Sequence, residues 1–368
     1  MADPRITKLA SLLINYSLEI KPGQQLVIVS NLLAEELLVE VYAEAIRAGA
    51  HVFLWSELPQ GWELFYKYAS GAQLDYVSPI NRLLAESFDA RLHIEAAQNT
   101  RALSGIDPTK MARRAKAQQP VNQIFFERAA RKELRWCSTL YPTHASAQEA
   151  DMSLLDYREF VFAAGKLDEP DPVASWRVEE RRQAELIGWL DGKNEVALKG
   201  ADIDLRLSIQ GRRFEPSDGK YNFPDGEIFT GPVESSANGW VRFRYPAIYG
   251  GQEVEDVELW FENGRVIREQ ASKGQELLSS LLNSDAGSRY LGEWGIGTNY
   301  SIPRFTKNML FDEKLGGTIH FAIGASYPET GGQNESGVHW DLLCDMADSE
   351  ITVDGELFYR NGRPVMWP

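Results

Sequence analysis

Five side chains that could bind metal ions lie in four short segments of the C-terminal half of the chain. Two dications carry four positive charges, which three carboxylates and one hydroxide would balance, and this lowers the cost of holding charge in a partly dry site. The set therefore predicts a site for two divalent ions, as found in metal-dependent hydrolases. The three carboxylates and two imidazoles belong to Glu227, Glu293, His320, His339 and Asp341.

The triplet His339-Trp340-Asp341 is the sharpest of these signals. In a strand, residues i and i+2 point to the same face, so the imidazole and the carboxylate can reach one ion while Trp340 packs behind them. The same triplet also fits a structural role, in which Asp341 holds a core histidine. The case for a metal site therefore depends on the joint occurrence of all five residues in one β-rich region.

The other candidate ligands also have structural interpretations. His320 lies in an apolar run with strand-like spacing, where a single histidine is often a core residue. Glu293 follows Gly292 in a glycine-rich segment, and a glutamate in such a loop is often solvated. Glu227 follows a turn and leads into an apolar segment, which would carry it toward a buried strand.

Three further residues near the triplet could take part in chemistry. Tyr327, seven residues after His320, could donate a hydrogen bond to a developing oxyanion, or it could be an aromatic side chain at a loop edge. Asn334 and Glu335 could fix the tautomer of a ligand imidazole. The chain contains no GxSxG, HExxH, GxGxxG or GxxxxGK[ST] motif, which argues against serine hydrolases, zincins, dehydrogenases and kinases.

Strand and helix patterns alternate in the first half of the chain, and these elements must support the site. The apolar run 24–29 predicts a buried strand, and residues 51–55 and 91–96 predict a second and a third strand. Helices are expected over about 32–48 and from 108 to about 118. Strands separated by helices imply βαβ units and a mainly parallel sheet.

The pattern changes after a long polar helix expected over about 173–191. Beyond it the chain reads as β strands, with one hairpin turning on Asn263-Gly264, a pair that favours a type I′ turn. The sequence therefore predicts an α/β plus α+β protein: a mainly parallel N-terminal α/β domain at residues 1–190 and a β-rich, metal-binding catalytic domain at residues 191–368.

Composition excludes several classes of partner. The net charge is −15 and no long run of Lys or Arg occurs, so nucleic acid is not expected as a partner. No apolar stretch reaches the roughly 18–20 residues that span a bilayer, so no membrane partner is expected either. The two cysteines, Cys137 and Cys344, fit a reducing compartment, and a cytoplasmic location is the expectation.

Four segments closely resemble the metallo-aminopeptidases of the thermophilic aminopeptidase T / aminopeptidase II family. The resemblance implies an N-terminal α/β domain, a β-rich catalytic domain and a homodimer. It also implies release of N-terminal residues from peptides with a free N-terminus by two divalent ions, for which Zn, Co, Mn or Mg would serve. The segments are NFPDGEIFTGP, YLGEWGIGTN, FDEKLGGTIHFAIGASYPETGGQNESGVHWDLLCDM and VDGELFYRNGR.

The resemblance also assigns roles to residues of this chain. Its active-site tyrosine would be Tyr327. In the first segment many relatives have two consecutive acidic residues, whereas this chain has Gly226-Glu227, so Glu227 is the available glutamate and Asp225 could assist. The family's metal ligands carry over to Glu227, Glu293, His320, His339 and Asp341.

The ligand set suggests a mechanism. Two ions would share a water and lower its pKa from 15.7 toward about 7, while one of them polarises the scissile carbonyl. Tyr327 would stabilise the tetrahedral oxyanion. Glu293 could accept the proton of the water, or the activated water could need no separate base.

One alternative uses fewer ligands. His320, His339 and Asp341 alone form the two-histidine, one-carboxylate set of mononuclear Fe(II) oxygenases. Sequences similar to this peptidase family include ring-cleaving dioxygenases acting on dihydroxypyridine. The presence of Glu227 and Glu293 argues against that chemistry here. A third interpretation, a non-catalytic scaffold, would give the five candidate ligands no catalytic function.

Overall fold

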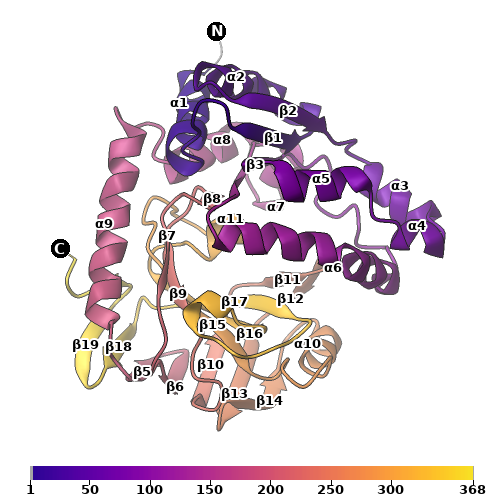
Figure 1. Ribbon diagram of the computed structural model, residues 1–368. Coiled ribbons are helices and arrows are strands. Elements are labelled where there is room, and N and C mark those ends of the chain that lie inside the picture. The colour runs from indigo at the N-terminus through magenta and orange to yellow at the C-terminus, as the bar shows by residue number, and fades with distance from the viewer. Residues whose placement is uncertain (1–2, 368) are drawn as a thin grey trace. The chain divides into compact units, whose positions relative to one another are not determined.

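In the computed structural model, which describes residues 3–367, the chain folds into two compact units (Figure 1). Unit 1 extends to Val173 and includes Gly219–Pro224, and unit 2 comprises Ala174–Asp218 and the residues from Asp225 onward. No helix in the described part of the chain is both long and apolar enough to cross a membrane.

Unit 1 is built on a five-stranded parallel sheet with the strand order β2-β1-β3-β4-β8. The sheet confirms the parallel arrangement that alternating strands and helices predicted. β1 is buried from Leu26 to Ser30, as the apolar run indicated. The strands are β1 (Gln25–Ser30), β2 (His51–Ser56), β3 (Ala90–Glu95), β4 (Arg135–Leu140) and β8 (Asn222–Phe223).

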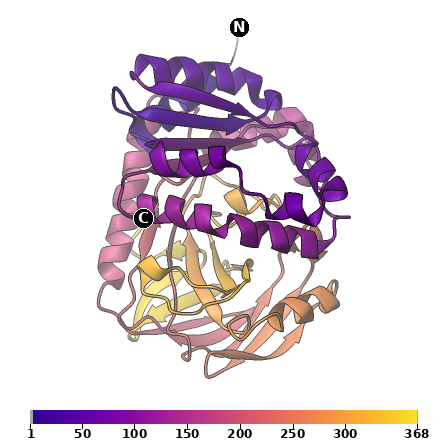
Figure 2. The same ribbon diagram turned by 45° about the vertical axis from the view of Figure 1, so that its right-hand side comes forward.

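Helices flank this sheet, with α1 and α2 on one face and α5 and α6 on the other (Figures 1 and 2). The side chain of Asn31 accepts a hydrogen bond from the Leu33 amide and so begins the helical segment expected over 32–48. The helical segments of unit 1 are α1 (Pro4–Leu12), η1 (Leu13–Ser17), η2 (Leu32–Ala34), α2 (Glu35–Arg47), α3 (Gly61–Tyr68), α4 (Gly71–Asp75), α5 (Pro79–Ser87), α6 (Pro108–Ala130), α7 (His144–Glu149) and α8 (Leu154–Ala164).

The helix α6 is longer than expected, because it continues through Pro120 to Ala130 instead of ending near residue 118. A proline inside a helix removes one backbone hydrogen bond, so the second half needs other support. Arg128 supplies it by donating hydrogen bonds to the carbonyl oxygens of Ala85 and Phe88, which ties α6 to the end of α5.

Unit 2 contains α9 (Pro172–Leu190) from Ala174 onward, followed by antiparallel sheets. The sequence places a domain boundary after residue 190, which is the end of this helix. That the chain divides there into two domains stays a prediction. The remaining short elements are the pair β11 (Ala247–Tyr249) and β12 (Gln252–Val254), together with α10 (Gln275–Leu282), α11 (Met309–Asp312) and η3 (Pro328–Thr330).

Two larger antiparallel sheets share one hydrophobic core in unit 2. Phe243 on one sheet and Phe321 on the other contribute to it, with ring centroids 6.5 Å apart. In strand order, the first sheet is β14 (Arg265–Gln270), β13 (Val257–Glu262), β10 (Asn238–Phe243), β6 (Ile203–Ser208), β5 (Glu195–Gly200), β18 (Ser349–Val353), β19 (Glu356–Arg360) and β20 (Arg363–Pro364). The second is β17 (His339–Asp345), β16 (Thr318–Gly324), β15 (Leu291–Gly297), β9 (Glu227–Thr230) and β7 (Glu215–Ser217).

The predicted hairpin on Asn263-Gly264 joins β13 to β14 and is confirmed. Asn263 has φ 49° and Gly264 has φ 82°, and a type I′ turn requires a positive φ at both central residues.

Candidate metal centre

All five candidate ligands lie on the five-stranded sheet of unit 2. Glu227 begins β9, Glu293 lies in β15, His320 lies in β16, and β17 carries both His339 and Asp341. These four strands are consecutive neighbours in the sheet. Strand pairing therefore brings together residues from four distant segments of the sequence.

The register of the strands places the ligands on one face of this sheet. Glu293 stands opposite Ala322 of β16, which in turn stands opposite Asp341 of β17. Glu227 stands opposite Gly297, four residues after Glu293. Side chains two or four positions apart share a face, so these residues point the same way. The other face carries side chains of the hydrophobic core, among them Trp294, Phe321 and Leu342.

Glu293 lies between the two histidines. Its Oε1 is 3.3 Å from Nε2 of His320, and its Oε2 is 3.3 Å from Nε2 of His339. Oε2 of Glu227 lies 3.3 Å from the same His320 nitrogen, and Oδ1 of Asp341 lies 3.7 Å from Nε2 of His339. The side chains thus form two groups that share Glu293, and the donor atoms within each group lie within 4.8 Å of one another.

The two groups differ in burial. The first, which we call the inner group, contains Glu227, Glu293 and His320, and these residues are no more than 5% exposed. The outer group shares Glu293 and adds His339 and Asp341, whose side chains are 27% and 15% exposed. A bound molecule therefore has easier access to the outer group.

The electrostatics of the five residues are strongly coupled. Burial raises the pKa of Glu293, but hydrogen bonds from His320 and His339 outweigh it and lower the pKa to about 2. Burial lowers the pKa of His320, but the hydrogen bond to Glu293 and the charge of Glu227 raise it to about 10. Burial raises the pKa of Glu227 to about 8, against the opposing charge of Lys314. The negative charge of the carboxylates must therefore be balanced by positive charge, which protonated imidazoles or divalent cations can supply.

The donor set fits divalent cations. Among residues 3–367, the buried Oε2 of Glu227 and the buried Oδ1 of Asp341 accept no hydrogen bond, although an imidazole nitrogen lies 3.3 Å from the first and 3.7 Å from the second. Buried polar atoms without a hydrogen bond are uncommon and costly, and one cation in each group would satisfy these oxygens. Carboxylate oxygens and imidazole nitrogens are ligands that Zn, Mn and related ions accept together.

A buried lysine beside the inner group was not identified from the sequence. Lys314 is fully buried, and its Nζ lies 3.3 Å from Oε1 of Glu227 and 3.9 Å from Oδ1 of Asp225, with Glu313 in direct contact. Burial lowers the pKa of Lys314, but the charges of Glu227 and Glu313 raise it above the ordinary lysine value. Asp225, which could have assisted as a ligand, therefore faces this lysine.

A backbone carbonyl, and not Asn334 or Glu335 as the sequence suggested, holds the imidazole of His339. Its Nδ1 lies 2.8 Å from the carbonyl oxygen of Ala325, so a backbone group fixes the tautomer with Nε2 free to bind a metal. Asn334 donates hydrogen bonds to the carbonyl oxygens of Gly287 and Gly324 and so holds the loop, and Glu335 is exposed.

Tyr327 lies next to the outer group. Its ring centroid is 5.0 Å from that of His339 and 5.4 Å from that of Phe229. The pKa of Tyr327 is raised by burial and then by the negative charges of Glu293 and Asp341, so its hydroxyl stays protonated and can act as a donor.

Histidines and cysteines outside the five candidate ligands do not enter these groups. Cys344 is buried in the hydrophobic core, and burial raises the pKa of its thiol to about 12. The remaining histidines lie in unit 1 and are His51, His93 and His144.

Substituting Gly295 by alanine should displace the His320 imidazole. Gly295 stands directly opposite His320, and a Cβ atom added to it would lie 2.0 Å from Cε1 and Nε2 of that ring. Because overpacking of a filled site costs about 1–3 kcal/mol, we expect a lower melting temperature and weaker metal binding. Calorimetry with added Zn or Mn would measure both effects. The exposed Gly337→Ala, whose Cβ would meet only the end of Asp285 at 3.5 Å, is the control. Unchanged metal affinity in Gly295→Ala would contradict the prediction.

The chain is similar to known proteins along nearly its whole length. A family model described as thermophilic metalloprotease (M29) matches residues 2–366. Aminopeptidase 2 of Geobacillus stearothermophilus is 29% identical over 412 residues, covering 98% of this chain and 97% of that protein. Aminopeptidase T of Thermus thermophilus is 27% identical over 397 residues, covering 97% and 95%.

A solved structure also resembles this chain along nearly its whole length. The structure of wild-type AmpT from Thermus thermophilus matches with a TM-score of 0.85 at 24% identity, covering 98% of this chain and 99% of that one. This likeness confirms the predicted fold class, a mainly parallel α/β part followed by a β-rich part.

Proposed function

Because the chain belongs to the M29 family of thermophilic metalloproteases, we propose that it is an aminopeptidase that releases N-terminal amino acids from peptides. The observation that carries the proposal is the pair of ligand groups that share Glu293. Two whole-length relatives that bear the name aminopeptidase support the substrate class.

The chain's own residues divide into ligands for two divalent ions. Glu227, Glu293 and His320 would hold one ion, and Glu293, His339 and Asp341 would hold the other, with one oxygen of Glu293 directed to each group. Bound ions in such a pair supply a water acidified toward neutral pH and polarise a carbonyl oxygen. Mixed imidazole and carboxylate ligands suit Zn, Co, Mn and Mg.

The remaining steps fall to protein groups around the site. Glu293 is a candidate to accept the proton of the attacking water because it lies between the two groups. Its lowered pKa makes it a weak base, so the activated water could instead need no separate base. Tyr327 would donate its hydroxyl hydrogen to the developing oxyanion, since it stays protonated beside His339. The N-terminal residue of the peptide would enter from the side of His339 and Asp341, which are the more exposed ligands.

Removing the hydroxyl of Tyr327 tests its role. We expect Tyr327→Phe to lower kcat by about 100-fold with little change in KM, because a lost oxyanion donor costs about 10²–10³ in kcat. The ring contacts with His339 and Phe229 would remain. Steady-state kinetics on leucine p-nitroanilide would measure the effect. The control is Tyr300→Phe, because the hydroxyl of Tyr300 donates a hydrogen bond to the Gly362 carbonyl oxygen and not to the site. A rise in KM at constant kcat would instead give Tyr327 a role in binding.

One titration tests the proposed function as a whole. The protein is treated with chelator and then supplied with Co, Zn, Mn, Mg or Fe(II) while leucine p-nitroanilide hydrolysis and bound metal are followed. Activity that rises to a plateau at two ions per chain would support the proposal. Metal binding without hydrolysis of any peptide in a broad panel would overturn it.

A mononuclear Fe(II) dioxygenase using His320, His339 and Asp341 is not favoured. The two histidines belong to different groups, and Glu293 lies between them within 3.3 Å of each. Saturation at one Fe(II) with no hydrolysis would restore that alternative. A homodimer and a cytoplasmic location stay predictions, which the mass in solution and cell fractionation would test.

A further inference from the structure

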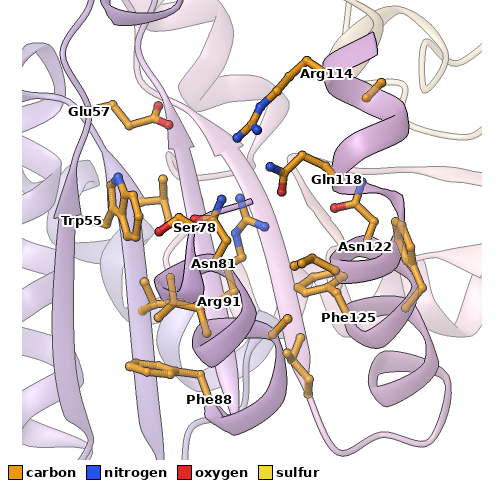
Figure 3. A pocket seen from close by; sticks show the side chains of 18 of the residues that line it. Trp55, Glu57, Ser78, Asn81, Phe88, Arg91, Arg114, Gln118, Asn122 and Phe125 are labelled. Carbon is orange, nitrogen blue, oxygen red and sulfur yellow. The ribbon is translucent and has the colours of Figure 1, made fainter. Parts of the chain in front are cut away.

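Unit 1 contains a cavity of about 690 Å³ that is separate from the five candidate ligands (Figure 3). It lies between the sheet and the helices α3, α5 and α6. Val27, Val29 and Trp55 line it from the strands, and Phe88 and Phe125 line it from the helix side. Cavities of about 300–1,000 Å³ with mainly apolar walls and a few polar groups are typical small-molecule sites.

Two opposite charges face this cavity without touching each other. Glu57 follows β2 and Arg91 lies in β3, and Figure 3 shows both side chains around the same space. Glu57 is half-buried and Arg91 is exposed. Burial raises the pKa of Glu57, and the charge of Arg91 opposes that rise through space. Within residues 3–367 the two form no ion pair at 4.0 Å or less, and Arg91 instead lies 5.7 Å from the ring centroid of Phe125.

Losing water without gaining a partner is unfavourable for a charged group, and this cost falls on half-buried Glu57 more than on exposed Arg91. The two side chains are held apart by the strand spacing, with cavity space between the helices and the sheet in front of them. A molecule that carries both an ammonium and a carboxylate group would neutralise both side chains at once. The pair of opposite charges therefore favours a zwitterionic ligand.

A second cation and several side-chain amides add to the polar part of the lining. Arg114 of α6 donates hydrogen bonds to the carbonyl oxygens of Leu74 and Tyr76, and its guanidinium is directed toward the cavity (Figure 3). Asn81 and Asn122 line the cavity from α5 and α6. The two arginines attract a carboxylate, while Glu57 disfavours ligands with several negative charges, such as nucleotides.

We propose that this cavity binds a free α-amino acid with a large apolar side chain. Its carboxylate would pair with Arg91, its ammonium group with Glu57, and its side chain would pack against Phe88, Phe125 and Trp55. The proposed peptidase reaction would release molecules of this class, so the cavity would sense product. The binding inference rests on the cavity alone, whereas product sensing rests on the proposed function.

Titration calorimetry of the metal-loaded, full-length protein with L-phenylalanine tests this inference. We expect one binding event that Arg91→Gln weakens by about tenfold or more, since charge-assisted hydrogen bonds are among the strong ones. Glu57→Gln should weaken it similarly, and Ala115→Trp, which adds bulk to the α6 wall, should remove it. Arg82→Gln is the matched control, because Arg82 lies on α5, pairs with Glu86 at 2.7 Å and is 65% exposed.

Two ligand analogues separate the parts of the inference. 3-Phenylpropionate lacks the ammonium group and L-phenylalaninamide lacks the carboxylate, so both should bind at least about tenfold more weakly than L-phenylalanine. Binding of L-phenylalanine that is unchanged in Arg91→Gln and Ala115→Trp would place it elsewhere and overturn the proposal. Equal binding of 3-phenylpropionate, or no binding of L-phenylalanine, L-leucine or L-tryptophan, would also overturn it. Peptide hydrolysis in these variants is measured separately, so a failure here leaves the peptidase proposal unaffected.

Discussion

Glu293→Gln should lose hydrolysis by a factor on the order of 10³ or more while the protein remains folded, because a metal pair supplies several kcal/mol of transition-state stabilisation. Glu293 is the one residue common to both ligand groups, with an oxygen 3.3 Å from each histidine. An amide keeps the size of the side chain but presents an NH₂ group to one of the two groups. We therefore expect fewer than two bound ions per chain as well as the loss of turnover.

Activity on leucine p-nitroanilide and bound metal, measured on the same samples, would check this result. Glu335→Gln is the matched control, because it makes the same chemical change on an exposed loop residue close in sequence to His339. Near-normal turnover in Glu293→Gln would remove Glu293 from the ligand set and from the role of proton acceptor. Lost turnover with two ions still bound would restrict its role to proton transfer.

Lys314→Met should lower the free energy of unfolding by about 3–5 kcal/mol, the range found when one partner of a buried ion pair is removed. Lys314 is fully buried and faces three carboxylates, on Asp225, Glu227 and Glu313. Methionine has a similar length but no charge, so the substitution leaves these carboxylates without their counter-ion. Urea denaturation in the presence of chelator would measure the change without a contribution from metal binding.

The control for this prediction is Lys273→Met, which removes an ammonium group paired with Glu253 and Glu255 at the surface. Exposed pairs contribute about 0–1 kcal/mol, so this variant should unfold nearly as the parent protein does. The double variant Lys314→Met with Glu313→Gln should recover part of the loss, because it removes one of the carboxylates that Lys314 neutralises. A loss below about 1 kcal/mol in Lys314→Met would show that the buried lysine is not needed as a counter-ion.

Much of the fold could be predicted from local patterns. Apolar runs marked the strands of unit 1, and the Asn263-Gly264 pair marked the hairpin between β13 and β14. These signals are local, since they depend on side-chain period and backbone conformation within a few residues. The two-residue strand β8 carries no such signal, because only pairing with β4 defines it. Because of this strand, residues Gly219–Pro224 belong to unit 1 although the chain before and after them belongs to unit 2. The composition of the sequence gives no sign of this.

The candidate site could be predicted as a set of residues but not as a geometry. Histidines and carboxylates near glycines suggested which side chains could bind metal ions, whereas the division into two groups follows from strand register. Lys314 was missed because its segment, with Glu313 before it, resembles an exposed charged turn. One signal was present, since apolar Phe311 and Leu315 lie close by and are buried.

The register of the four ligand-bearing strands makes the site far more sensitive to deletions and insertions than to point substitutions. Deleting one residue of β15 between Glu293 and Gly297 would rotate the glutamate onto the face that Trp294 now occupies in the core. Strand pairing does not fix the length of the connections after β15 and β16, but the first carries Lys314 and the second carries Tyr327. Chain length can therefore vary in these connections only where the two side chains keep their places, whereas within the strands the count of residues is fixed.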